Sequence, residues 1–146
     1  MTHPAPALAD AARTMFEADA ASAALGIRVE HALDGAASAR MTVTDTMVNG
    51  HGIAHGGYIF LFADTAFACA CNTYGPVTVA AGAEITFVTS ARLGDELTAV
   101  AEERTRYGRN GIYDVTVYRE TPEGREVVAE FRGRSRTIAE VQPRES

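Results

Sequence analysis

Apolar positions along the chain follow two periods, one helical and one alternating. In residues 6–25, apolar side chains recur among alanines at helical spacing, which predicts an amphipathic helix that stops at Gly26. Residues 58–74 are apolar almost all round, and a run of this length favours a buried helix over a strand. Gly75 and Pro76 follow directly, so this second helix ends there.

The alternating period predicts six strands, separated by short segments rich in Gly, Pro, Asn and Asp. They span residues 27–31, 37–43, 77–89, 96–106, 111–119 and 126–138. Residues 44–57 hold four glycines and two histidines, which predicts a loop. A helix that is apolar on every side must be enclosed, and a long antiparallel sheet curled around it would do so. The order of elements therefore indicates an α+β protein.

Composition and charge narrow the class of protein. The 146 residues are 47% hydrophobic, which suits one domain with a sizeable core. The net charge of −6 argues against binding to nucleic acid, because phosphates are neutralised by basic surfaces. All thirteen basic residues other than histidine are arginines, so a lysine Schiff base is excluded.

The two cysteines and the lengths of the apolar runs indicate the cellular compartment of the protein. Cys69 and Cys71 stand two residues apart inside the apolar helix, where a disulfide between them is geometrically implausible. They are expected to be reduced, as in a cytoplasmic protein. The first sixteen residues lack the pattern of a signal peptide, and no run reaches the ~18 apolar residues of a membrane span. The sequence thus predicts a cytoplasmic protein without a membrane partner.

Asp64 is the most informative residue, because it lies in the middle of the apolar helix. Burying an ionised carboxylate costs several kcal/mol unless it is hydrogen-bonded or paired. A structural explanation is a small polar stripe with Thr65, or a position that faces a partner subunit. A functional explanation is a catalytic carboxylate.

The segment before the helix, residues 49–57, favours the functional explanation. Glycines at a helix start let a ligand approach the backbone, and the free N–H groups there favour developing negative charge. That arrangement would form an oxyanion hole for acyl transfer, with Asn49 and His55 as further donors. His51 and His55 are four residues apart, but zinc binding at this spacing needs a helix, so we expect no metal site.

Residues 47–72 resemble the signature of the phenylacetic acid degradation (PaaI-type) thioesterases of the hotdog superfamily. The matching positions are Asn49, His55, Gly56, Gly57 and Asp64, and similarity continues in residues 26–30, 85–97, 111–118 and 131–138. The resemblance implies a hotdog fold, with a long central helix wrapped by a curved antiparallel sheet of five to six strands. It also implies a metal-independent acyl-CoA thioesterase, with aryl-acetyl-CoA esters such as phenylacetyl- or hydroxyphenylacetyl-CoA as substrates.

The resemblance assigns a role to each site residue. The Gly56 N–H would bind the thioester oxygen, and Asp64 would act as general base or nucleophile. Asn49 and His55 would orient water and the thioester. No cofactor is implied, because coenzyme A enters only as part of substrate and product. Some relatives place a Ser or Thr near Ala80 to help hold the water, which leaves Thr78 as a weak substitute here.

Helix geometry predicts an oligomer. Gly56 and Asp64 are eight residues apart, which is roughly 12 Å along one helix. One thioester cannot reach both within a single chain, because reacting groups must approach to about 3–3.5 Å. If both act on one substrate, the active site is shared between the subunits of a homodimer. The resemblance further implies a dimer of dimers.

Arginines offer sites for the phosphates of coenzyme A, because a guanidinium binds phosphate through two hydrogen bonds. The candidates are Arg109, Arg134 and Arg136, with Gly108 beside Arg109 and Gly57 at the helix start. The alternative is ordinary surface pairing of these arginines with glutamates. Two other functions remain open at this point, namely a hotdog hydratase or dehydratase and a non-catalytic acyl-CoA-binding module.

Overall fold

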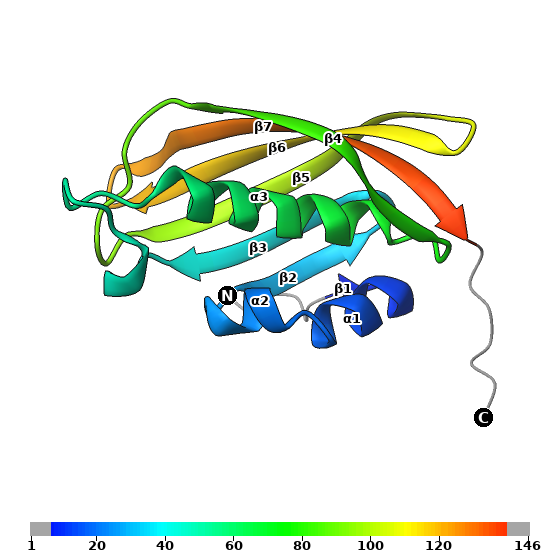
Figure 1. Cartoon of the computed structure of the whole chain (residues 1–146), viewed down its shortest axis with the longest axis horizontal. Helices are drawn as coiled ribbons and strands as arrows, with labels where there is room; N and C mark the ends of the chain where they lie inside the picture. The colour runs from blue at the N-terminus through cyan, green and yellow to red at the C-terminus, as the bar shows by residue number, and fades with distance from the viewer. Residues whose placement is uncertain (1–6, 140–146) are drawn as a thin grey trace.

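A long helix, α3 (Gly56–Cys71), lies across the concave face of one antiparallel sheet in the computed structural model, which describes residues 7–139 (Figure 1). The other elements are β1 (Ala7–Leu8), α1 (Asp10–Glu17), α2 (Ala20–Ala24), β2 (Arg28–Leu33), β3 (Ala36–Thr42), a 3₁₀ turn (Asp45–Met47), β4 (Val77–Phe87), β5 (Glu96–Tyr107), β6 (Asn110–Thr121) and β7 (Gly124–Ala139). The strand order is β1-β2-β3-β5-β6-β7-β4, and every neighbouring pair is antiparallel except β1 and β2.

The predicted α+β class, with a central helix wrapped by a curved antiparallel sheet, is confirmed. The six long strands match the six expected ones to within a few residues. The predicted count of five to six strands is one too low, because the two-residue β1 pairs with β2 and adds a seventh. Helix α3 begins two residues earlier than predicted, at Gly56, because His55 caps it with its side chain.

The single helix predicted for residues 6–25 is wrong. Within the described residues it is two helices, α1 and α2, while Pro6 lies outside them. The break falls at Ala18 and Asp19, where the Asp19 carboxylate caps α2 by accepting a hydrogen bond from the Ser22 N–H. Asp favours such a cap over a helix interior, and this preference interrupts the alanine-rich run.

Small residues let α3 lie close to the sheet. The inward positions of β3 and β5 include Ala37, Ala39, Ala99 and Ala101, all buried. A side chain at Gly133 of β7 would place its Cβ 2.7 Å from the Phe67 ring, so only glycine fits beneath that ring. The sheet therefore packs closely against α3, and apolar residues line most of the length of the helix.

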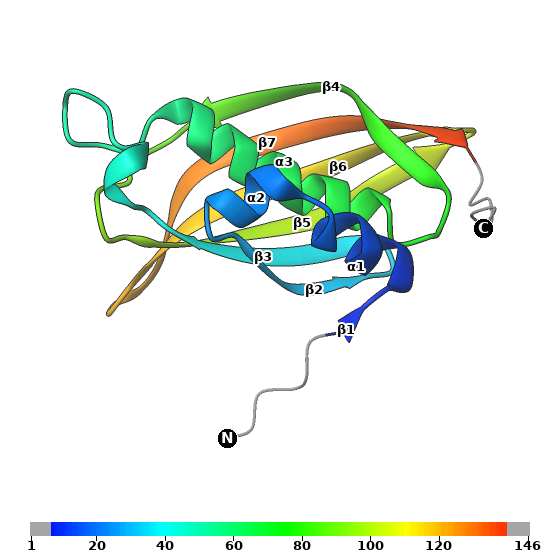
Figure 2. The same ribbon diagram turned by 60° about the horizontal axis from the view of Figure 1, so that its bottom comes forward.

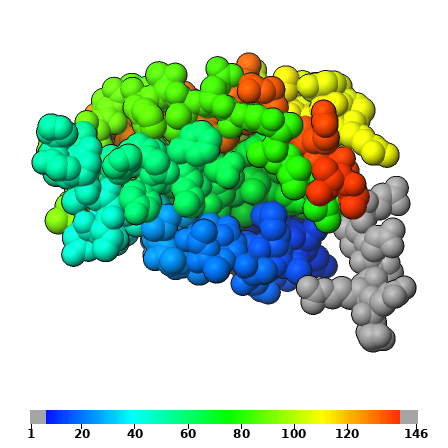
Figure 3. Space-filling view, in the orientation of Figure 1, coloured from blue at the N-terminus to red at the C-terminus, as the bar shows by residue number. Residues whose placement is uncertain are grey.

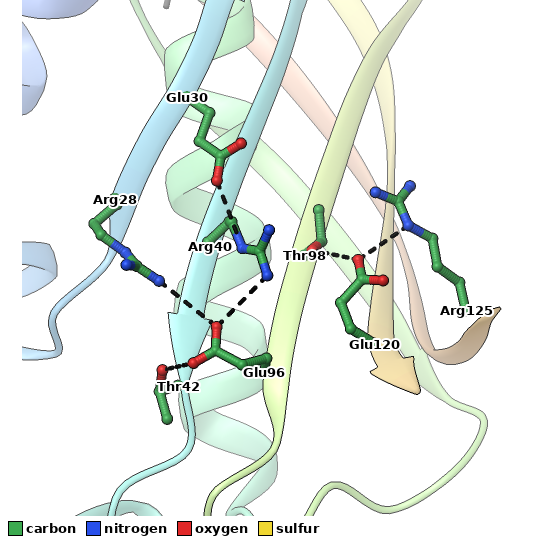
Figure 4. Close-up of polar contacts among 8 residues, drawn as sticks. All are labelled: Arg28, Glu30, Arg40, Thr42, Glu96, Thr98, Glu120 and Arg125. Atoms are coloured by element: carbon green, nitrogen blue, oxygen red, sulfur yellow. Dashed lines mark hydrogen bonds and ion pairs between the residues drawn. The ribbon is translucent and has the colours of Figure 1, made fainter. Parts of the chain in front are cut away.

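Charged side chains occupy the opposite, outer face of the sheet (Figure 4). Arg40 on β3 lies between Glu30 and Glu96, and Arg28 also pairs with Glu96. Thr98 and Arg125 both donate to Glu120. Ion pairs this exposed add little stability, so this face is mainly a solvated surface.

Helix α3 is not fully enclosed, which corrects the expectation from its apolar sequence. Helices α1 and α2 cover one flank of it (Figure 2), but a strip between them and β4 stays uncovered (Figure 3). Four side chains are spaced three or four residues apart along α3, so they share one face of the helix, and all of them are only half-buried: Tyr58, Leu61, Asp64 and Ala68. Among the described residues, no helix is long and apolar enough to cross a membrane.

Candidate active site

A tight loop presents Asn49 beside the start of α3. The Asn49 N–H donates to the Ile53 carbonyl (2.8 Å), and its side-chain Oδ1 accepts from the N–H groups of His51 (2.8 Å) and Ile53 (3.4 Å). Gly52 adopts φ 74°, a conformation that glycine reaches without strain. Because Oδ1 is used by the loop, the Nδ2 amide is the part of Asn49 that can serve a substrate.

His55 decides which backbone donor is free at the helix start. Its Nδ1 accepts from the Gly57 N–H (3.3 Å), which requires an unprotonated Nδ1. The Gly57 donor is therefore engaged, and the Tyr58 N–H donates to the His55 carbonyl. The Gly56 N–H has no partner among the hydrogen bonds of the described residues, so it is the donor open to a ligand.

The aromatic ring of Phe87, at the end of β4, lies against Gly56. A Cβ on Gly56 would stand 2.8 Å from Phe87 Cζ, so a larger residue here would displace the ring. Phe87 is itself 52% exposed. Glycine at this position thus serves both the free N–H and the close approach of an aromatic wall.

Asn49, Gly56 and Phe87 line a pocket of about 360 Å³, together with Ile59 and Val88. We call it the N-terminal pocket, after the end of α3 that it adjoins. It has apolar walls and a few polar groups, which is typical of sites for small organic ligands. The structure therefore brings Asn49 and Gly56 together, with His55 adjacent in the chain.

Asp64 does not line this pocket. It lies two turns further along α3, about 12 Å from Gly56 along the axis. Burial raises its pKa, and the negative charge of Asp19 raises it further. Its carboxylate has no hydrogen-bond partner among the described residues, which is a costly position for a group without another purpose.

Comparison with known proteins decides the family. The sequence model of the thioesterase superfamily matches residues 51–125, which include Gly56 and Asp64. The chain belongs to the thioesterase superfamily. Over 127 residues this thioesterase is 42% identical to the acyl-coenzyme A thioesterase PaaI of Escherichia coli, covering 87% of this chain and 89% of that protein. It is also 40% identical over 124 residues to a putative esterase of Deinococcus radiodurans, covering 84% and 82% of the two chains.

A solved structure agrees with the sequence comparison. The E. coli PaaI protein from the phenylacetic acid degradation operon superposes on this thioesterase with a TM-score of 0.84, covering 89% of this chain and 92% of that one. The hotdog fold and the resemblance to PaaI-type thioesterases are therefore confirmed. The chain is a hydrolase of thioester bonds by family.

In this thioesterase, the two threonines suggested as hydroxyl neighbours of Asp64 form their hydrogen bonds with other residues. Thr78 bonds to Asn72, Pro76 and Thr137 beyond the C-terminal end of α3, so it is no substitute for the missing hydroxyl. Thr65 does not form a polar stripe with Asp64 either, because its hydroxyl bonds to the Leu61 carbonyl and to Ser22.

The predicted coenzyme residues of this thioesterase fall into two groups. Arg134 and Arg136 lie on the outer face of β7, where Arg134 crosses Gly82 and pairs with Glu84 (3.1 Å). Ordinary surface pairing with a glutamate therefore accounts for Arg134. Gly108 and Arg109 form the β5–β6 turn and line a second pocket, of about 200 Å³, at the other end of α3.

We call this second hollow the C-terminal pocket. Arg106 stacks on the Tyr74 ring at 3.6 Å and pairs with Glu103 (3.1 Å). Ser135 lines the pocket, is only 4% exposed, and has no hydrogen bond from its hydroxyl among the described residues. The sequence interpretation did not single out Tyr74 and Ser135, because only folding brings them to Arg109.

Proposed function

We propose that this protein is a cytoplasmic acyl-CoA thioesterase in which Asp64 activates water against the thioester carbon. The Gly56 N–H and the Asn49 Nδ2 amide would hold the thioester oxygen as negative charge develops on it. His55 would keep its Nδ1 on Gly57 and so fix the start of α3. The similarity to PaaI of E. coli supports an aryl-acetyl-CoA substrate such as phenylacetyl-CoA.

One observation carries this proposal, namely a half-buried carboxylate with a raised pKa and no hydrogen-bond partner among the described residues. A raised pKa makes a carboxylate a stronger base once it is ionised. The same feature serves a nucleophile, and the two roles share the requirement that Asp64 be ionised. A purely structural carboxylate would be expected to have partners.

The separation of Asp64 from the N-terminal pocket supports a homodimer with shared sites. About 12 Å of helix cannot be spanned by one thioester carbon, so the partner's Asp64 would complete each pocket. A two-fold axis then gives two equal sites, each with Gly56 and Asn49 from one subunit. Two such dimers are proposed to pair into a tetramer, as the family resemblance implies.

The edge strand β4 fits the dimer surface of this proposal. It is eleven residues long and, within residues 7–139, pairs only with β7, so one edge is open to another strand. Val77, Val79 and Phe87 on this strand are 44%, 42% and 52% exposed, as is Val88 just after it at 52%. Apolar residues on an unpaired edge favour a second copy of the chain as the occupant.

Arg109 is the strongest candidate for a coenzyme phosphate. It has no ion pair among the described residues, whereas Arg106 is engaged by Glu103 and Arg134 by Glu84. The C-terminal pocket adds hydroxyls from Ser135 and Thr137, which can donate to phosphate oxygens. Arg136 also has no ion pair among the described residues. It is the cross-strand partner of Asn110, which directly follows Arg109 in the chain.

A panel of acyl-CoA esters tests the proposed function. We expect purified protein to release CoA, detected with a thiol reagent, and to turn over phenylacetyl-type esters faster than linear acyl esters. Addition of water to an enoyl-CoA without release of CoA would instead indicate a hydratase. Tight binding of every ester with no turnover would indicate a binding module.

Replacing Arg109 tests the coenzyme site. Arg109→Gln is expected to raise KM for acyl-CoA about three- to tenfold with little change in kcat, because a phosphate contact is made equally before and during reaction. A thioester of N-acetylcysteamine, which lacks the nucleotide, should show no change. Arg125→Gln, at the β6–β7 turn, is the matched control. Equal losses on both substrates would mean that Arg109 does not contact the coenzyme.

A further inference from the structure

A chain of hydrogen bonds joins the break between α1 and α2 to the centre of α3. Asp19 accepts from the Ser22 N–H (3.0 Å) and from the Ser22 hydroxyl (2.6 Å). The Ser22 and Thr65 hydroxyls lie 2.8 Å apart, and Thr65 directly follows Asp64. The chain therefore connects one carboxylate, Asp19, to the helical turn that carries another, Asp64.

The direction of this chain follows from its acceptor end. A carboxylate can only accept, so the single hydroxyl hydrogen of Ser22 points to Asp19. The single hydrogen of the Thr65 hydroxyl is then shared between the Leu61 carbonyl (3.0 Å) and the Ser22 oxygen (2.8 Å). The link from Ser22 is therefore polarised toward Asp19.

Burial indicates that the chain is a built feature. Ser22 is 1% exposed and Thr65 is 5% exposed, and hydroxyls buried this deeply are costly unless they are hydrogen-bonded. The pair holds α2 against α3 one residue from Asp64. Capping alone does not explain aspartate here, because Asn or Ser would cap α2 about as well without a like charge near Asp64.

Few other titratable groups face this part of α3. Cys69 and Cys71 lie on α3 itself, and burial raises the pKa of each thiol to about 12, so they are neutral. Tyr113 of β6 lies near Cys71 toward the C-terminal end of α3, and its hydroxyl donates to Glu103 of β5. Tyr58 lies on α3 two turns before Asp64, and Glu17 of α1 lines a groove against β2. Glu84 of β4, Asp114 of β6 and Glu126 of β7 each pair with an arginine of the sheet. Asp19 is thus the charge that acts on Asp64.

We infer that Asp19, held by Ser22 at the cap of α2, is a positioning residue that keeps a negative charge near Asp64 and so makes Asp64 a stronger base. The inference rests on the proposed function of Asp64. Helices α1 and α2 then contribute to the reaction, because the negative charge belongs to Asp19, the residue that caps α2. It also explains why a repulsive pair of carboxylates is kept in a half-buried place.

The variant Asp19→Asn separates the charge from the cap, since Asn also caps helices well. Removing the charge lowers the pKa of Asp64, so the acid limb of kcat/KM against pH is expected to move to lower pH. The plateau of kcat/KM at high pH should fall by less than about tenfold, because Asp64 can still accept a proton although it is a weaker base. Thr65→Val is the control, because it breaks the chain and leaves the charge, so stability should fall while the acid limb stays.

A second readout is independent of turnover. The carboxyl carbon of Asp64, followed by ¹³C NMR across pH, should titrate at lower pH in Asp19→Asn than in the wild type. If neither the kinetic limb nor the NMR titration moves, the inference is overturned and Asp19 only caps α2. If the NMR titration moves but Asp64→Asn stays active, the proposed function fails instead. Should Asp19→Asn fail to fold, Asp19→Ser removes the same charge and retains a capping oxygen.

Discussion

Asp64→Asn is expected to lower kcat for acyl-CoA hydrolysis by about 10²- to 10⁴-fold, the usual contribution of a general base. The amide keeps the shape of the carboxylate but cannot take a proton from water or attack the thioester. Asp34→Asn is the matched control, because Asp34 lies in the exposed β2–β3 turn at φ 52°, which Asn also tolerates. Steady-state kinetics of both variants measure the effect. A kcat above about a tenth of the wild-type value would make Asp64 structural.

The stability of Asp64→Asn has a predictable sign. A carboxyl whose pKa is raised by folding prefers its protonated form in the folded state, so its ionisation destabilises the fold as pH rises above the unfolded pKa. A neutral amide escapes this cost at neutral pH. The melting temperature near pH 7 should therefore equal or exceed that of the wild type, which separates lost chemistry from lost folding.

The fold was predictable where one physical signal dominates. The length and apolar character of residues 58–74 indicate a helix, and period-two alternation indicates the strands. The break at Asp19 was hidden, because its neighbours Ala18 and Ala20 are strong helix formers. Partial exposure of α3 could not be predicted either, since an apolar strip left uncovered for a partner looks the same in sequence as a buried one.

The site was predictable in its residues and less so in their arrangement. The glycines and Asn49 before α3 indicate a helix-terminal donor site, and the N-terminal pocket contains Asn49 and Gly56. Sequence does not tell that His55 occupies the Gly57 donor or that the loop uses Asn49 Oδ1, because both depend on side-chain rotamers. Thr78 was misplaced for a similar reason, since strand register decides what it faces.

Mixing two inactive variants is expected to restore about a quarter of wild-type activity if sites are shared between subunits. One variant is Asp64→Asn. The other is Asn49→Asp, which retains an oxygen for the N–H groups of His51 and Ile53 and loses only the donor amide. Asn49→Ala is less suitable, because it would also remove those loop contacts. A negative charge beside a developing oxyanion should leave Asn49→Asp nearly inactive alone.

The expected recovery follows from two-fold symmetry. Equal amounts that exchange at random give about half mixed dimers, and each mixed dimer has one site with both lesions and one with neither. Half of the sites in half of the dimers are intact, which gives the quarter. Native mass spectrometry of chains with different tags shows that exchange has occurred, and melting curves show that both variants fold. Mixed dimers without recovered activity would mean that Asp64 acts with Asn49 and Gly56 of its own chain, although about 12 Å of helix separates Gly56 from it.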